Sequence, residues 1–154
     1  MNVDILKRYK KMQSRFDLPH LSELRQTFNF DLDESDDILE KIRLEMSEKL
    51  FTFTEKIIEP LIFTTEETYN FEQNMLTQTE MDELFSLYKK LQVLKWNNNL
   101  LTVKPDEKET VIWINKTWKL WNDEVGKKMT QLCSKFSKEW EKMQFKSEKT
   151  NYHS

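Results

Sequence analysis

The sequence of 154 residues contains no alanine, and it has only one glycine, one cysteine and three prolines. With Gly126 alone, the glycine-rich loops that cradle phosphates or dinucleotides are excluded. The single Cys133 has no partner for a disulfide within the chain, which favours a reducing compartment, and we expect a cytoplasmic protein. No apolar run approaches the roughly 18 residues of a membrane span, and residues 1–16 lack the apolar core of a signal peptide.

Histidine is equally scarce, which argues against catalysis and metal binding. His20 and His153 are the only two, and neither has a second ligand at metal-binding spacing. The acidic segment from Asp31 to Asp37 resembles a calcium loop, but the sixth position is Asp36 instead of glycine and the twelfth is Ile42 instead of glutamate. Cys133 follows an apolar position, so we expect an inert buried thiol. The sequence therefore predicts no cofactor, no metal site and no enzymatic activity.

Hydrophobic residues, by contrast, are abundant in the C-terminal third and follow a helical period. Between residues 106 and 143, apolar side chains recur every three or four residues, with lysines between them. This pattern predicts a long amphipathic helix that begins after Asp106 and buries Trp118, Trp121 and Trp140. It does not decide whether the helix bends or breaks at Asn122. The apolar positions are Val111, Ile114, Trp118, Trp121, Val125, Met129, Leu132, Phe136, Trp140 and Met143.

A second long helix is predicted from Asp36 to about Leu61, capped by Asp33 or Ser35. Its apolar residues lie on two sides, so we expect this helix at the centre of a bundle, with Pro60 kinking or ending it. The first line is Leu39, Ile42, Met46, Leu50, Phe53, Ile57 and Leu61, and the second is Leu44, Phe51 and Ile58.

Shorter elements complete the expected fold. Residues 3–16 form a basic amphipathic helix, and a second helix capped by Asp17 runs to Asn29. Residues 63–77 form a long connection that includes a short helix at most. A capping box at Thr77 to Glu80 opens another helix, which residues 96–99 break before an extended run at 100–104. The prediction is a single all-α domain over residues 1–154, an irregular bundle of about five helices, in which 1–16 is a basic helix or arm and 144–154 a frayed polar tail.

Several short motifs resemble a family of small all-helical archaeal proteins of unassigned function. They are Leu18-Pro19 with Leu24, Ile42-Arg43, Glu48-Lys49-Leu50, Leu87-Tyr88-Lys89-Lys90-Leu91 and Trp140-Glu141-Lys142. The resemblance covers most of residues 18–142, and it implies a helical domain in an intracellular setting. It transfers no activity and no site residue.

Two functional hypotheses follow from the aromatic and basic residues. In the first, the chain is a non-enzymatic interaction module or adaptor subunit, and Trp96 and Trp113, which lie off the apolar stripe, anchor another protein. In the second, it is an accessory factor that contacts nucleic acid through Lys7, Arg8, Lys10, Lys11 and the C-terminal lysines. The charge is +4 over residues 1–16, −13 over 17–83 and +6 over 84–154, but 20 of the 24 basic residues are lysine, which disfavours nucleic acid. The oligomeric state cannot be predicted.

Overall fold

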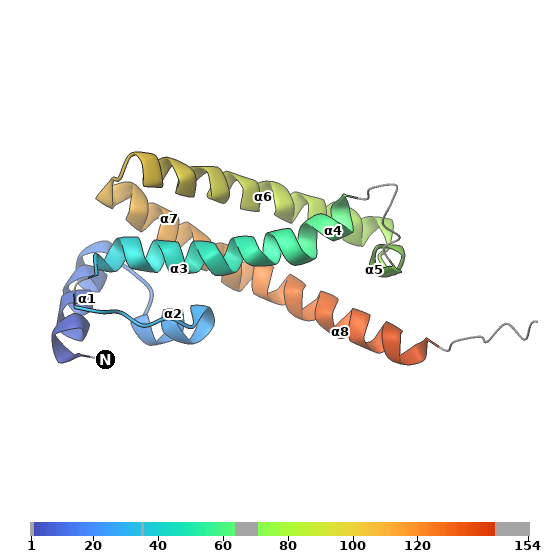
Figure 1. The fold of residues 1–154 in the computed structure, drawn as a ribbon, viewed down its shortest axis with the longest axis horizontal. Helices are drawn as coiled ribbons and strands as arrows, with labels where there is room; N and C mark the ends of the chain where they lie inside the picture. Colours follow the sequence, from blue (N-terminus) through green and yellow to red (C-terminus); the bar gives the residue numbers. More distant parts are fainter. Residues whose placement is uncertain (1, 35, 64–70, 144–154) are drawn as a thin grey trace, which may run out of the picture.

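The computed structural model describes residues 2–34, 36–63 and 71–143, and all of its regular secondary structure in these ranges is helical. The predicted all-α fold is confirmed (Figure 1). The α-helices are α1 (Val3–Phe16), α2 (Leu21–Phe28), α3 (Ile38–Phe53), α4 (Glu59–Ile62), α5 (Phe71–Asn74), α6 (Gln78–Val103), α7 (Glu107–Leu120) and α8 (Gly126–Lys142). Two π-helical segments, Thr54–Ile58 and Trp121–Val125, join α3 to α4 and α7 to α8.

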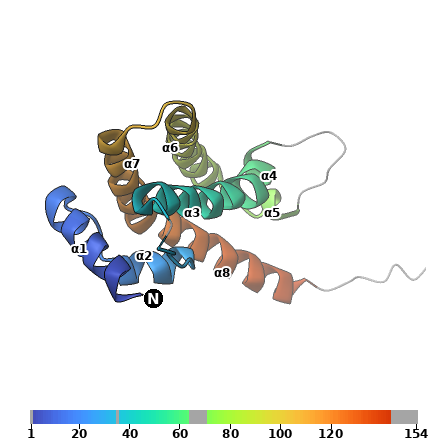
Figure 2. The ribbon, with the colours of Figure 1, turned by 60° about the vertical axis from the view of Figure 1, so that its left-hand side comes forward.

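Helix α3 lies at the centre of the bundle, as predicted from its two apolar sides. It packs against α7 and α6 on one side and against α2 on the other (Figure 2). Ile42, Met46 and Leu50 on its first apolar line are buried. The second line is covered only in part, because Leu44 is exposed and Ile58 is buried.

The first π-helical segment lies just before Pro60. A proline within a helix lacks an N–H donor and clashes with the preceding turn. The chain widens into the π turn over Thr54–Ile58, where the Glu59 N–H donates to the Thr54 carbonyl five residues earlier. The helix then ends at Ile62, two residues after Pro60, in agreement with the prediction.

The second π-helical segment carries the C-terminal helix through Asn122 without a break. Trp121 and Gly126 both keep right-handed helical dihedral angles. A π turn holds more residues than an α turn, so it delays the rotation of the helix. Even so, the apolar stripe stays on the core side through this turn, because Val111 and Ile114 before it and Val125, Met129 and Leu132 after it are buried.

The predicted burial of the tryptophans is confirmed only in part. Trp113, expected on a flank, is 3% exposed, whereas Trp118 and Trp121 are half-buried against Phe28. Trp140 is 44% exposed, with its ring packed on Phe71 and its indole N–H donating to Glu72. The predicted burial is thus wrong for Trp140.

Cys133 was also expected in the core, and this expectation is wrong because its thiol is exposed. It follows the buried Leu132 by one helical position, a rotation of about 100° that carries it out of the core.

Two of the predicted helix caps are corrected by the structure. Asp17 ends α1 in the left-handed conformation, with φ of 52°, and α2 begins after His20 without a side-chain cap. Helix α3 is capped by Asp37, whose carboxylate accepts from the Glu40 N–H at 3.2 Å, and not by Asp33; Ser35 lies outside the described residues. The predicted caps at Thr77 and Asp106 are confirmed.

Helix α6 continues through the asparagines that were expected to break it, so the extended run predicted at 100–104 is wrong. Asn98 points into the core, where its side-chain oxygen and backbone carbonyl both accept from the Arg43 guanidinium. Leu94 and Leu101 bury the same side of the helix. Asparagine costs a helix well under 1 kcal/mol relative to alanine, and these tertiary contacts outweigh that cost.

Tyr9 ties α1 to the loop before α2 and supplies a pH-dependent contribution to stability. Its buried hydroxyl donates to the Pro19 carbonyl at 2.5 Å, and burial raises its pKa far above the ordinary value near 10. The neutral hydroxyl is therefore favoured in the folded state, so this contribution is complete below pH 10 and is lost as the pH rises further.

We expect Tyr9→Phe to lower the free energy of unfolding by about 1 kcal/mol at neutral pH, because the Pro19 carbonyl loses its donor. Urea denaturation at pH 8 and pH 11 measures this effect. The difference between the wild type and the variant should shrink at pH 11, and a difference that grows there would contradict the assignment.

Candidate protein-interaction surface

One side of α6 exposes a continuous row of large hydrophobic residues, Val93, Trp96, Leu100 and Val103, here called the α6 face. Their exposed fractions are 61%, 66%, 59% and 84%. Among the described residues, these are four of the five most exposed large hydrophobic side chains. Single exposed apolar residues are normal on a protein surface, but a contiguous row marks an interaction site.

The geometry of the helix explains why this row is exposed. Its members are separated by three, four and three residues, so they form one line along the helix. The opposite side of α6 carries Leu84, Leu87, Leu91 and Leu94, which are buried against the bundle. Helix α6 is thus apolar on two sides, but the bundle covers only one of them, since α6 forms its upper edge in Figures 1 and 2.

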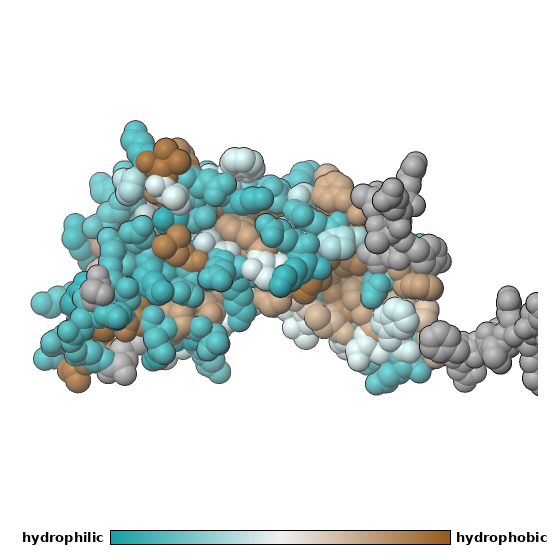
Figure 3. All heavy atoms as spheres, viewed as in Figure 1, coloured by the Kyte–Doolittle hydropathy of each residue, from teal (hydrophilic) through white to brown (hydrophobic). Residues whose placement is uncertain are grey.

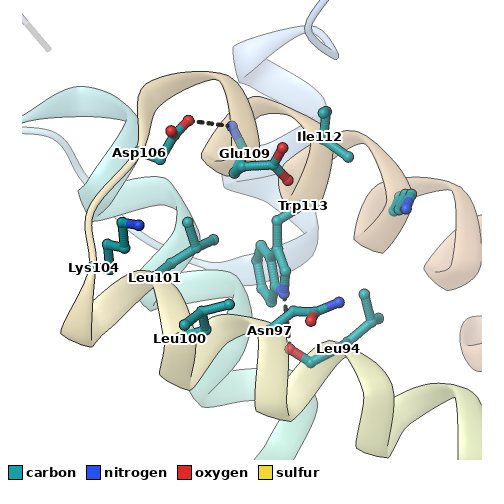
Figure 4. Close-up of a pocket in the computed structure, with 10 residues that line it drawn as sticks. Leu94, Asn97, Leu100, Leu101, Lys104, Asp106, Glu109, Ile112 and Trp113 are labelled. Atoms are coloured by element: carbon teal, nitrogen blue, oxygen red, sulfur yellow. Dashed lines mark hydrogen bonds between the residues drawn. The ribbon is translucent and has the colours of Figure 1, made fainter.

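A cavity of about 290 Å³ lies beside the α6 face, between the C-terminal half of α6 and the first turns of α7. The indole of Trp113 forms one wall, held by a 2.9 Å hydrogen bond from its N–H to the Leu94 carbonyl (Figure 4). Leu100 and Ile112, both exposed, line it from the two helices. Figure 3 shows hydrophobic atoms on the surface at this end of the molecule, where α6 turns into α7.

Charged groups of both signs surround the cavity. Lys104 and Lys116 contribute positive charge, and Asp106 and Glu109 contribute negative charge. Asp106 is fixed in place because its carboxylate accepts the Glu109 N–H at 2.9 Å as the N-cap of α7. An apolar centre within a polar, charged rim is the usual composition of a protein–protein interface.

The two tryptophans proposed as anchors have different positions. Trp96 is exposed, as predicted, and belongs to the α6 face. Trp113 is buried, so the prediction that it is a surface anchor is corrected: it supports the cavity from beneath. Leu100 and Val103 were not predicted on this face because residues 100–104 were expected to be extended, and without them Val93 had no apolar row to belong to. Their spacing of three and four residues was the signal that could have identified them.

The basic residues of α1 lie on the surface, close to the acidic segment between α2 and α3. Lys7, Lys10 and Lys11 are exposed, and the Arg8 guanidinium donates to the carbonyls of Glu34 and Asp36. Several C-terminal lysines are neutralised within the protein, because Lys128 pairs with Glu83 and Lys135 with Glu80. Helix α1 and the end of α8 lie at opposite ends of the molecule in Figure 1, so the two basic segments do not form one surface.

The side chains considered for metal binding and catalysis are not brought together. No group of three or more histidine, cysteine or acidic side chains suited to a metal ion occurs in the described part of the chain. His20 is exposed and its ring Nδ1 lies 3.1 Å from the Gln13 amide, while His153 lies outside the described residues. None of the described helices is both long and apolar enough to cross a membrane.

Comparisons with protein-family models, curated proteins and solved structures found no match for this chain. The resemblance to small archaeal helical proteins therefore stays a prediction, and function must be argued from the surface of the molecule itself.

Proposed function

We propose that this chain is a non-enzymatic, cytoplasmic protein-interaction module that binds an amphipathic helix of its partner on the α6 face. The observation that supports the proposal is the exposure of Trp96 at the centre of a row of four apolar residues, beside a preformed cavity. Tryptophan is the residue type most enriched among interface hot spots. Leaving this row in water has no structural benefit, whereas covering it with a partner removes its apolar area from solvent.

A helix is the partner element that fits this row best. From Val93 to Val103, the row spans about 15 Å, or close to three helical turns. A partner helix with apolar residues at the same three- and four-residue spacing would match it along its whole length. The row is flanked by uncharged Asn97 and Asn99, so the partner needs no buried charge.

The test removes the two largest side chains of the α6 face by Trp96→Ala with Leu100→Ala. Both residues are exposed, and alanine favours a helix, so the fold should be retained. The matched control is Leu44→Ala with Trp140→Ala, which removes a leucine and a tryptophan that are 43% and 44% exposed elsewhere.

Tagged versions are used to recover bound proteins from native cell extract, once with nuclease and once without it. We expect the α6-face variant to lose the proteins that the wild type recovers, and the control to retain them. Equal loss in both variants, or recovery that depends on nucleic acid, would contradict the proposal. In the second case, replacing Lys7, Lys10 and Lys11 by glutamine should abolish recovery, as the nucleic-acid hypothesis requires.

A further inference from the structure

The α6 face is symmetric about Asn98, a buried residue at the middle of the row. Trp96 and Leu100 lie two residues before and after it, and Val93 and Val103 lie five residues before and after it. The spacing of three, four and three is therefore the same in both directions, with large side chains in the centre and valine at each end. A row with this property can pair with itself across a two-fold axis, where residue i of one copy meets residue j of the other and the reverse.

We propose that the occupant of the α6 face is the α6 helix of a second copy of this chain, packed antiparallel about a two-fold axis near Asn98. This inference rests on the proposed function and names the partner helix. In this pairing, each Trp96 meets the Leu100 of the other copy, and each Val93 meets the other copy's Val103. The exposed apolar row of each copy is then covered by an identical row.

The charges at the two ends of the row favour the antiparallel orientation. Lys89 and Lys90 precede the row within α6. Beyond the end of α6 at Val103, the turn and the first turn of α7 carry three acidic and two basic residues and are acidic on balance, namely Asp106, Glu107 and Glu109 with Lys104 and Lys108. Antiparallel pairing places the basic end of each copy near the acidic end of the other, while a parallel pairing would place like charges together. Lys104, at the acidic end, is placed near the uncharged Gln92 of the other copy.

At the basic end, Lys89 is the lysine placed to make this contact. Lys90 is committed to its own chain by a 2.8 Å ion pair with Glu124. The Lys89 ammonium lies 5.5 Å from the centre of the Phe85 ring on the exposed side of α6, and among the described residues it forms no ion pair. Lys89 is therefore the residue that should reach the acidic end of the second copy.

The size of the row indicates a dimer that dissociates on dilution. A stable interface buries about 800 Å² on each partner, and one largely exposed tryptophan supplies only on the order of 150 Å² of that area. Phe85 and Ile112, which are both exposed at the margins of the row, add further area. Even with them, the area buried on each copy is small for a specific interface. We expect a dissociation constant on the order of micromolar.

Sedimentation velocity of the purified full chain between about 1 and about 500 µM tests the proposal across the expected range. The wild type should pass from monomer to dimer as its concentration rises. Trp96→Ala with Leu100→Ala should raise the dissociation constant at least about 30-fold. The control Leu44→Ala with Trp140→Ala should leave it unchanged.

A charge exchange tests the orientation. Lys89→Glu places two acidic groups opposite each other in both symmetric contacts and should raise the dissociation constant about three- to tenfold. Adding Glu107→Lys to the same chain reverses both ends and should restore dimerisation. Two results would overturn the antiparallel pairing. One is a dissociation constant that Trp96→Ala with Leu100→Ala leaves unchanged, and the other is a dimer that Glu107→Lys fails to restore in the Lys89→Glu chain.

The two proposals fail in distinguishable ways. If the wild type stays monomeric to the highest concentration but loses recovered proteins on Trp96→Ala with Leu100→Ala, the second copy is excluded and the proposed function stands with another protein's helix as occupant. If the chain stays monomeric and the recovered proteins are unaffected, both proposals are wrong.

Discussion

Replacing Trp113 by alanine should lower the free energy of unfolding by about 3–5 kcal/mol, the usual cost of deleting a buried aromatic side chain. The indole is 3% exposed, and its N–H donates to the Leu94 carbonyl at 2.9 Å. It joins α7 to α6, so the variant loses both packing and a buried hydrogen bond. A domain of this size is stabilised by roughly 5–15 kcal/mol in total, so the variant should be marginally folded.

Urea denaturation followed by circular dichroism measures this loss, and Trp96→Ala is the matched control. Because Trp96 is 66% exposed, its replacement should change the free energy of unfolding by no more than about 0.5 kcal/mol. If both variants lowered the free energy of unfolding equally, the assignment of Trp113 as buried and Trp96 as exposed would be contradicted.

The second large effect is expected at Arg43, which is 3% exposed and pairs with no carboxylate among the residues that the structure describes. Burial lowers the pKa of its guanidinium, an effect that the nearby Glu40 carboxylate opposes. The guanidinium is stabilised by the backbone and side-chain oxygens of Asn98 and by the Thr102 hydroxyl at 3.4 Å. These contacts fasten the C-terminal half of α6, which carries Leu100 and Val103, to α3.

We expect Arg43→Ala to lower the free energy of unfolding by about 2–4 kcal/mol, because Asn98 loses its donor and the buried stem of the arginine is removed. Asn98→Ala should lower the free energy of unfolding less in the Arg43→Ala background than in the wild type. A double-mutant cycle in urea should give a coupling energy of at least about 1 kcal/mol. Strictly additive losses would show that the two side chains do not depend on each other.

The period of the apolar residues was sufficient to predict the helices but not how wide or how long the buried side of each helix is. In the C-terminal helix, the buried side includes Thr110 and Thr117 beside the apolar stripe, and Trp113 lies between them in the core. Trp140 follows the stripe but lies two residues before the end of α8, where its ring packs on Phe71 and stays 44% exposed. Both outcomes depend on packing between segments that lie far apart along the chain.

The asparagines of α6 illustrate a similar limit. Residues 97–99 have poor helix propensity, and on that basis the helix was expected to end there. The partner that keeps it intact, Arg43, is 55 residues earlier in the sequence. Trp96 could be identified as an exposed anchor from its sequence context, but the full α6 face becomes visible only when the helix is known to reach Val103.

The uneven distribution of charge along the sequence is partly explained by ion pairs between acidic and basic segments in the fold. The hypothesis that acidic and basic segments lie side by side is supported by Lys135 with Glu80 and by Lys128 with Glu83. The hydrogen bond from Lys135, followed by that from the Thr77 N–H, lowers the pKa of the Glu80 carboxyl. Lys128 and Lys135 of the C-terminal region thus stabilise the contact between α8 and α6.

Hydroxyl-radical footprinting of Trp96 in native cell extract, compared with the purified protein at a concentration well below the expected micromolar dissociation constant, tests the central claim most directly. Trp140 is the internal control, since it offers the same indole chemistry at 44% exposure near the C-terminal end of α8. If the α6 face is covered by a helix of a partner or of a second copy, oxidation of Trp96 should fall several-fold in extract while that of Trp140 stays constant. Equal oxidation of Trp96 in both samples would contradict the assignment of α6 as the binding surface.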